Sequence, residues 1–201
     1  MAVAAGLEII CLVSGAFGIV SPIQGWGPDP GPQITVRVYA GLSDSMTVST
    51  GGNFPGVALW DAYGGLIGFE DGTSSKIGDG ASGDIQVSSD GRSAEYIAVS
   101  NGGDDGLCIS SLAITMSNGD QLGWFGDVGM ACGAPWYHSN AILGNANYRP
   151  ACVWIDRDGS NGHPYQGMSI HLPDFLSTNG LSQQYQDKIN TMCKSVPRFT
   201  M

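Results

Sequence analysis

Short apolar runs separated by turn residues constrain the fold of this chain more than any other feature. Of its 201 residues, 31 are glycine, and Ser, Asn and Asp are frequent between the apolar runs. These residue types favour tight turns rather than long helices. Because 42% of the residues are hydrophobic, the chain can still bury a core. Its length suits one well-buried domain and is too short for two ordinary ones.

Nine segments have the alternation or the apolar content of β-strands. In the clearest, Ile34, Val36 and Val38 point to one side of an alternating run. The regular spacing of strands and turns predicts an all-β fold, either an antiparallel β-sandwich or a jelly roll. The expected strands are 34–39, 57–60, 66–69, 84–87, 95–99, 107–116, 121–125, 151–155 and 167–172.

Turn signals between these segments predict hairpins. Residues 61–65 form a short glycine-containing connection, and Asp90-Gly91 separates two further strands. Asn118-Gly119 suits a type I′ turn, in which both central residues have positive φ.

One helix is expected near the C-terminus. Ser182 can cap it, and Pro197 ends it. Its apolar stripe comprises Tyr185, Ile189, Met192, Cys193 and Val196.

The N-terminal residues 1–23 are almost wholly apolar and precede a Pro/Gly-rich linker, 24–32. A secretory signal peptide and a retained apolar helix that contacts a partner or a membrane both fit this segment. Glu8 and the lack of a basic residue before Arg37 argue against a typical signal and against a spanning helix. The folded β-domain is expected over 33–201.

Four cysteines of the domain indicate two disulfide bonds and an oxidising, extracellular compartment. Their spacing lacks the short Cys and His intervals of zinc sites. The alternative is four buried thiols in a cytosolic protein. Of the three pairings that four cysteines allow, we expect Cys108–Cys132 and Cys152–Cys193; the fifth, Cys11, lies in the apolar segment.

The charge balance makes nucleic acid an improbable partner. Eight Lys and Arg against 18 Asp and Glu give a formal charge of −10. The basic residues are scattered, whereas nucleic-acid binding needs clustered cations that release counterions.

An oxygen-rich turn suggests a calcium site. Asp156, Asp158 and Ser160 alternate in a glycine-containing segment, and Ca²⁺ prefers hard oxygen ligands. The match to a calcium loop is partial, and a plain turn in which carboxylates cap backbone amides is the alternative. A second stretch of this kind is 101–106.

Aromatic residues near polar loops suggest a carbohydrate site, because rings stack on sugar C–H groups while carboxylates bind hydroxyls. We expect Trp136, Tyr137, His138 and Asp127 to form it, since glycine and proline place the aromatic pair in a loop. Most aromatic side chains of a small sandwich belong to its core, which is the alternative. The other aromatic residues considered are Trp26, Trp60, Trp124, Trp154 and Tyr165.

Five motifs stand out in the second half of the chain, at residues 105–109, 123–129, 132–139, 152–156 and 166–175. They resemble motifs of small secreted fungal proteins of uncharacterised function, and the resemblance covers about residues 53–176. It implies secretion and a disulfide-bonded β-fold, without an activity and without catalytic residues to carry over. The lack of a basic region before the apolar segment departs from a typical secreted precursor.

We therefore expect a secreted protein that binds a glycan or another cell-surface component rather than catalysing a reaction. One alternative is a membrane-active, pore-forming protein that inserts residues 1–23. Another is a small hydrolase or cyclase with a site near His138, His171 and Asp127, of which His171 should face away from the core.

Overall fold

The computed structural model describes residues 32–143, 147–175, 184–185, 187–195 and 198–201. The apolar segment 1–23 and the linker 24–32, apart from Pro32, lie outside these residues, and the predictions for them stay predictions. Within the described residues, no helix is long and apolar enough to cross a membrane.

The described chain is mostly β, as predicted, and each of the nine expected strands is present with ends that differ by at most two residues. The sequence did not predict β2, β5, β10, β13 or the short helical elements. The strands are β1 (Gln33–Ala40), β2 (Gly52–Phe54), β3 (Gly56–Trp60), β4 (Leu66–Glu70), β5 (Thr73–Ile77), β6 (Ser82–Ser88), β7 (Tyr96–Ser100), β8 (Leu107–Thr115), β9 (Gln121–Phe125), β10 (Trp136–Tyr137), β11 (Cys152–Ile155), β12 (Gly167–His171) and β13 (Phe199–Thr200). The helical elements are α2 (Asp127–Ala131), η2 (Leu172–Phe175) and η3 (Thr191–Ser195).

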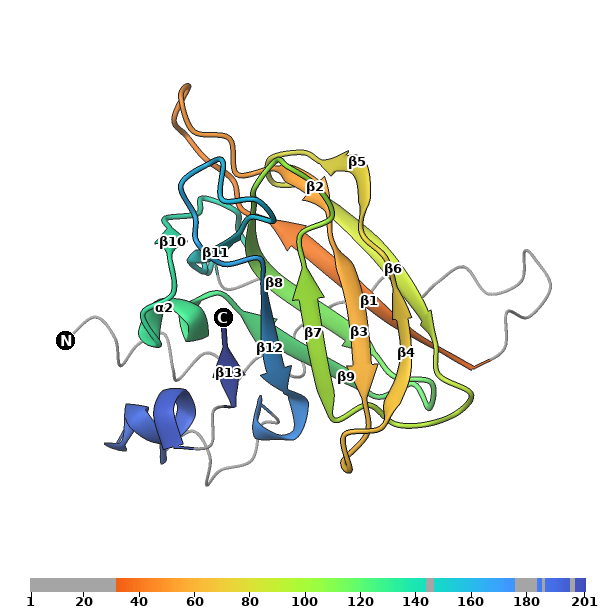
Figure 1. The fold of residues 1–201 in the computed structure, drawn as a ribbon. Coiled ribbons are helices and arrows are strands. Elements are labelled where there is room, and N and C mark those ends of the chain that lie inside the picture. The colour runs from red at the N-terminus through yellow and green to blue at the C-terminus, as the bar shows by residue number, and fades with distance from the viewer. Residues whose placement is uncertain (1–31, 144–146, 176–183, 186, 196–197) are drawn as a thin grey trace.

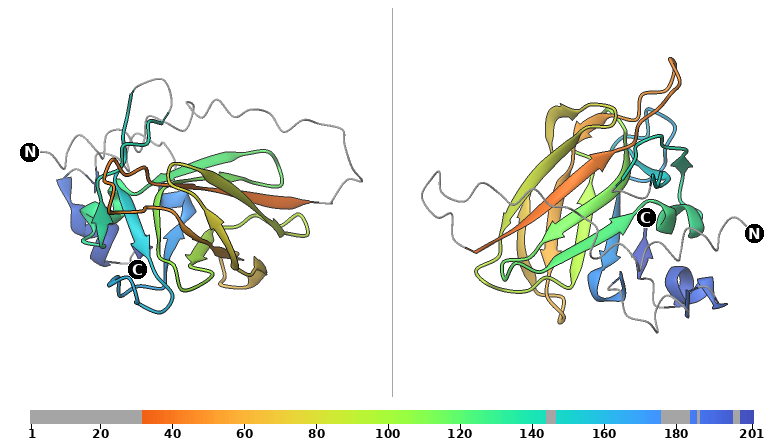
Figure 2. Two further views of the ribbon diagram at one scale, coloured as in Figure 1. Left: turned by 90° about the horizontal axis from the view of Figure 1, so that it is seen from above. Right: turned by 180° about the vertical axis from the view of Figure 1, so that it is seen from behind.

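Two antiparallel sheets form the body of the molecule. The first has the strand order β10-β11-β8-β1-β6, with β9 also paired to β8. The second has the order β13-β12-β7-β3-β4, and β2 pairs with β5 separately. The views from the front and from above show these two sheets as two layers (Figures 1 and 2). Strands adjacent in a sheet are therefore often far apart in the sequence.

The core lies between the two layers. Ile34, Val36 and Val38 of β1 are fully buried, as their alternation predicts. Leu59 of β3 and Ile97 of β7 close the core from the second sheet. Strands with alternating burial, such as β1 and β12, thus contribute one face to a common core, whereas β8 and β11 are buried on both faces.

A bulge in β8 keeps this long strand facing the core along its whole length. Leu107 and Ile109 face inward before the bulge, and Leu112 and Ile114 face inward after it. The register with β1 shifts at Ala40, and the Ser110 hydroxyl donates to backbone carbonyls of β1. Because the bulge adds one residue, odd-numbered residues face the core before it and even-numbered residues face the core after it.

Two of the three predicted hairpins are present. β3 and β4 pair across residues 61–65, and β8 and β9 pair across Asn118-Gly119. The type I′ prediction is wrong, because of these two residues only Gly119 has positive φ. The hairpin across Asp90-Gly91 is also wrong: the chain turns there, but β6 and β7 belong to different sheets.

The start of the expected C-terminal helix at Ser182 lies outside the described residues. Within them, η3 forms a helical turn, and Tyr185 and Met192 are buried in the core. The structure therefore supports the predicted packing of this apolar stripe at two positions.

Two disulfide bonds are present, as predicted, but the expected pairing is wrong. Cys108 pairs with Cys152, and Cys132 pairs with Cys193. The first bond joins β8 and β11, which are neighbours in the first sheet. The sequence alone does not show that β11 pairs with β8, which is why the expected partners were not the true ones.

Candidate binding face

The open face of the second sheet carries a row of large side chains. Val57 and Leu59 of β3 point into the core, so Ala58 and Trp60 lie on the opposite face. Trp60 stands opposite Leu66 of β4 on one side and Tyr96 of β7 on the other. Neighbouring strands are about 4.8 Å apart, so these side chains form a continuous row across the sheet.

His171 of β12 completes the row at its other end. It stands opposite Tyr96 in the register, and the two rings stack with centroids 4.4 Å apart. His171 lies on the face away from the core, as its alternation with Met168 and Ile170 predicts. The row thus crosses four strands on the open face.

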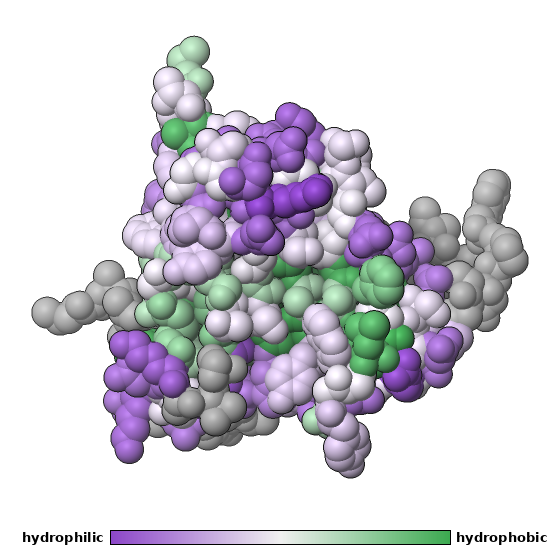
Figure 3. Space-filling view, viewed as in Figure 1, coloured by the Kyte–Doolittle hydropathy of each residue, from purple (hydrophilic) through white to green (hydrophobic). Residues whose placement is uncertain are grey.

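Small residues beside the row leave a shallow trough. Ala58 and Ala98 stand opposite each other two residues further along their strands, on the same open face, and Phe69 of β4 lies beside them. A pocket of about 260 Å³ lies here, and an apolar band crosses β7, β3 and β4 (Figure 3). The residues that line the pocket are Gly56, Val57, Ala58, Leu66, Phe69, Glu70, Asp71, Gly72, Ala98 and Ser100.

The apolar side chains of this face are open to solvent. Phe69 is 60% exposed, Leu66 49% and Tyr96 36%. Exposed apolar patches of this kind, bordered by polar residues, commonly mark sites of interaction. The trough is therefore the strongest candidate for a ligand site among the described residues.

Ion pairs hold the His171 end of the row in place. The Nδ1 atom of His171 lies 2.5 Å from an Asp174 carboxylate oxygen, and Arg198 lies 3.0 Å from the other oxygen of that carboxylate. Glu95 lies 3.7 Å from the Nε2 atom of His171. Because His171 stacks on Tyr96, these contacts also fix the Tyr96 ring, and a fixed ring loses less entropy on binding.

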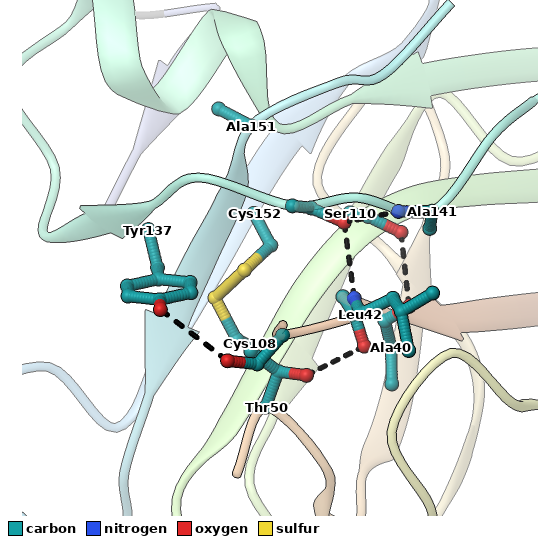
Figure 4. The surroundings of a disulfide bond; sticks show 12 residues. Ala40, Leu42, Thr50, Cys108, Ser110, Tyr137, Ala141, Ala151 and Cys152 are labelled. Carbon is teal, nitrogen blue, oxygen red and sulfur yellow. Dashed lines mark hydrogen bonds between the residues drawn. A yellow bond between two sulfur atoms is a disulfide. The ribbon is translucent and has the colours of Figure 1, made fainter. Parts of the chain in front are cut away.

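The predicted pair Trp136 and Tyr137 does not form a joint platform. Both belong to β10, where adjacent side chains point to opposite faces. Trp136 is 49% exposed, but Tyr137 packs against the Cys108–Cys152 disulfide, and its hydroxyl lies 3.3 Å from that of Ser43 (Figure 4). His138 follows them as an exposed residue.

Asp127, the predicted carboxylate of that site, is buried at the start of α2. It is 8% exposed and accepts hydrogen bonds from the Tyr148 hydroxyl and the Ala151 amide. Burial raises the pKa of Asp127, and these hydrogen bonds partly offset the rise. Burial of the Tyr148 hydroxyl and its hydrogen bond to Asp127 raise the pKa of Tyr148. These contacts give Asp127 a structural role.

The raised pKa of Asp127 predicts a pH-dependent effect of Asp127→Asn. A carboxyl whose pKa is higher in the folded chain favours folding below its unfolded-state pKa, and this contribution is lost as the pH rises through the folded-state pKa. Asparagine does not titrate. The stability of the variant relative to the wild type should therefore improve as the pH rises from about 3 to about 7. Urea unfolding across that range measures it, and a pH-independent difference would contradict the assignment.

The three histidines do not meet. His163 stacks on Trp154 with centroids 4.3 Å apart, and burial lowers its pKa. His171 contacts Asp174 rather than Asp127, so their contacts do not assemble the hydrolase site considered above. Across the described ranges, no three His, Cys, Asp or Glu side chains gather in a way that could hold a metal ion.

The predicted metal residues lie together in the turn that follows β11. Asp158 accepts a hydrogen bond from the Ser160 amide at 2.9 Å, and Asp156 accepts one from the Asn161 amide at 2.9 Å. Ser160 donates its hydroxyl to the Asp104 carbonyl, which belongs to the second oxygen-rich stretch. The structure thus joins two stretches that the sequence keeps apart.

Sequence reasoning considered Trp60 and did not select it, and it missed Tyr96 and Phe69. Alternation in the expected strands 57–60 and 95–99 was enough to place Trp60 and Tyr96 opposite the core residues. That the two strands are neighbours is visible only in the fold, since 35 residues lie between Trp60 at the end of β3 and Tyr96 at the start of β7.

No protein-family model matches the chain, and no curated protein is similar to it at a significant level.

Proposed function

We propose that this chain is a secreted, non-catalytic β-sandwich protein that binds a neutral glycan in the trough of its second sheet. The observation that carries the proposal is the row formed by Trp60, Tyr96 and His171, which lies in register on an open sheet face.

The shape and chemistry of the trough support a sugar ligand. A flat sheet presents its rings side by side, and exposed rings stack on the C–H groups of a pyranose. Ala58 and Ala98 make a low floor that leaves room for a ring. The carboxylates of Glu70 and Asp71 at the rim can accept hydrogen bonds from sugar hydroxyls.

The charge of the site supports a ligand without negative charge. Glu70 and Asp71 line the trough, and its lining contains no Lys or Arg among the described residues. The whole chain has a formal charge of −10. Like charges facing each other disfavour binding, so sulfated or uronic-acid polymers should bind poorly.

Two disulfide bonds support the secreted location. Such bonds persist in oxidising compartments and are rare in the cytosol. The membrane-active alternative depends on residues 1–23, which lie outside the described residues, so no observed contact favours it.

We expect truncation of the aromatic residues of the row to weaken glycan binding. Truncating a central aromatic residue of a binding site commonly costs 2 kcal/mol or more, so Trp60→Ala and Tyr96→Ala should each weaken binding by about tenfold or more. The measurement is pull-down on insoluble cellulose, chitin and β-1,3-glucan, followed by titration with oligosaccharides of any polymer that retains the protein. Thermal unfolding of each variant confirms that it is folded.

Trp136→Ala is the matched control, because Trp136 is an exposed tryptophan outside the second sheet. It should bind like the wild type. Unchanged binding by Trp60→Ala and Tyr96→Ala would contradict a role of the row beside the trough, and loss of binding by Trp136→Ala would move the site to β10. Failure of the wild type to bind any glycan on a broad array would overturn the proposed function.

A further inference from the structure

Two oxygen-rich loops that lie far apart in the sequence meet at one end of the first sheet. Leu107 of β8 pairs with Ile155 of β11, so the loop 101–106 that enters β8 lies beside the loop 156–162 that leaves β11. Contacts join the loops: the Ser160 hydroxyl donates to the Asp104 carbonyl at 3.0 Å, and the Gly106 amide donates to the Asn161 side chain at 3.1 Å.

A buried carboxylate oxygen lies at this junction without a partner. Asp156 is 1% exposed, and its Oδ2 atom accepts a hydrogen bond from the Asn161 amide. Its Oδ1 atom is inaccessible to solvent and has no hydrogen-bond partner among the residues that the structure describes. A buried oxygen of this kind costs free energy unless a donor or a cation satisfies it.

A second carboxylate faces the same place. Asp158 lies two residues further along the turn, on its exposed side, and the Asp156 carboxyl lies within hydrogen-bonding reach of it. The Ser160 amide that Asp158 accepts is next in the chain to the Asn161 amide that Asp156 accepts, so the two carboxylates cap one turn. Two neighbouring carboxylates repel each other, and a bound cation relieves the repulsion.

We infer that Asp156 Oδ1 and Asp158 bind a Ca²⁺ ion at the junction of the two loops. The buried atom that lacks a partner is a carboxylate oxygen, the ligand type that Ca²⁺ and Mg²⁺ prefer, and Ca²⁺ accepts the more variable shell of the two ions. Ser160 holds the two loops together, since its hydroxyl donates to the Asp104 carbonyl and its amide donates to Asp158.

The small number of carboxylates predicts a weak site. Because the described residues gather no three acidic, His or Cys side chains, carbonyl, amide and water oxygens must supply the rest of the shell. Sites with few charged ligands in extracellular modules have dissociation constants of about 10⁻⁴–10⁻³ M. Such a site fits a secreted protein, but it does not depend on glycan binding.

The test is direct binding of Tb³⁺ and Ca²⁺ to the purified full chain after treatment with a chelator. Trp154 lies two residues before Asp156 and can sensitise Tb³⁺ luminescence. We expect sensitised emission that Ca²⁺ displaces and Mg²⁺ displaces poorly. About 10 mM Ca²⁺ should also raise the melting temperature by about 5 °C.

Variants locate the ion. Asp158→Asn, at an exposed position that the fold tolerates, should weaken Ca²⁺ binding about tenfold or more, and Asp156→Asn should do the same if it folds. Asp120→Asn is the matched control, because Asp120 lies in a different exposed turn beside Asn118, and it should bind Ca²⁺ like the wild type. Absence of sensitised emission and of a thermal shift in the wild type, or unchanged binding by Asp158→Asn, would overturn the inference.

Discussion

Replacing Cys108 and Cys152 together by alanine should lower the free energy of unfolding by about 4 kcal/mol. The bond closes a loop of 44 residues, and release of that loop increases the conformational entropy of the unfolded chain. Both cysteines are fully buried, and a side chain on Gly41 would lie 2.6 Å from the Cys152 sulfur, so the region is tightly packed (Figure 4). Urea unfolding of the double variant and the wild type measures the difference.

The second disulfide provides the comparison for this experiment. The bond between Cys132 and Cys193 spans 61 residues, so its removal should destabilise the chain by a similar amount. It joins the turn after α2 to η3, which lies outside the two sheets. A loss below about 1 kcal/mol for the Cys108–Cys152 variant would show that strand pairing alone holds β8 and β11 together.

Trp124→Ala should destabilise the fold by about 3–5 kcal/mol. Trp124 lies on β9 of the first sheet and is 1% exposed. Its ring stacks on Phe199 of β13 in the second sheet, with centroids 5.6 Å apart. Truncation therefore leaves a cavity between the two layers. Denaturant unfolding measures its cost when it is monitored by far-UV circular dichroism, which does not depend on tryptophan fluorescence.

Trp124→Phe is the matched variant. It retains a ring for the contact with Phe199 and removes the indole N–H, which has no hydrogen-bond partner among the described residues. It should cost much less than Trp124→Ala, because a smaller cavity forms and no polar group is left unsatisfied. Equal losses for the two variants would contradict the assignment of the stability to the volume of the ring.

The candidate site was only partly predictable, because its residues come from strands that are distant in the sequence. Alternation places Trp60 and Tyr96 on the face opposite the core, but it does not show that β3 and β7 are neighbours. Glycine and proline beside Trp136 and Tyr137 favoured an aromatic pair in a loop. The structure places the two residues in β10, where adjacent side chains point to opposite faces, so they do not form one surface.

The roles of the glycines were also only partly predictable from the sequence. The sequence indicates turns wherever glycine occurs, and Gly119 is such a turn residue. Gly52 and Gly102 instead lie where two backbones approach: an added Cβ atom would lie 2.1 Å from the Gly106 carbonyl oxygen at the first, and 2.1 Å from that of Phe54 at the second. Only the packing of distant segments creates this requirement.

The sequence by itself determined nine of the strands, the inward faces of the alternating ones and the presence of disulfide bonds, because side-chain alternation and cysteine content are local properties of the chain. The tertiary structure decided which strands pair, which cysteines join and which loops meet. Hydrogen bonding between strands is largely independent of side-chain identity, so the partners of β8 and β7 depend on how the whole core packs.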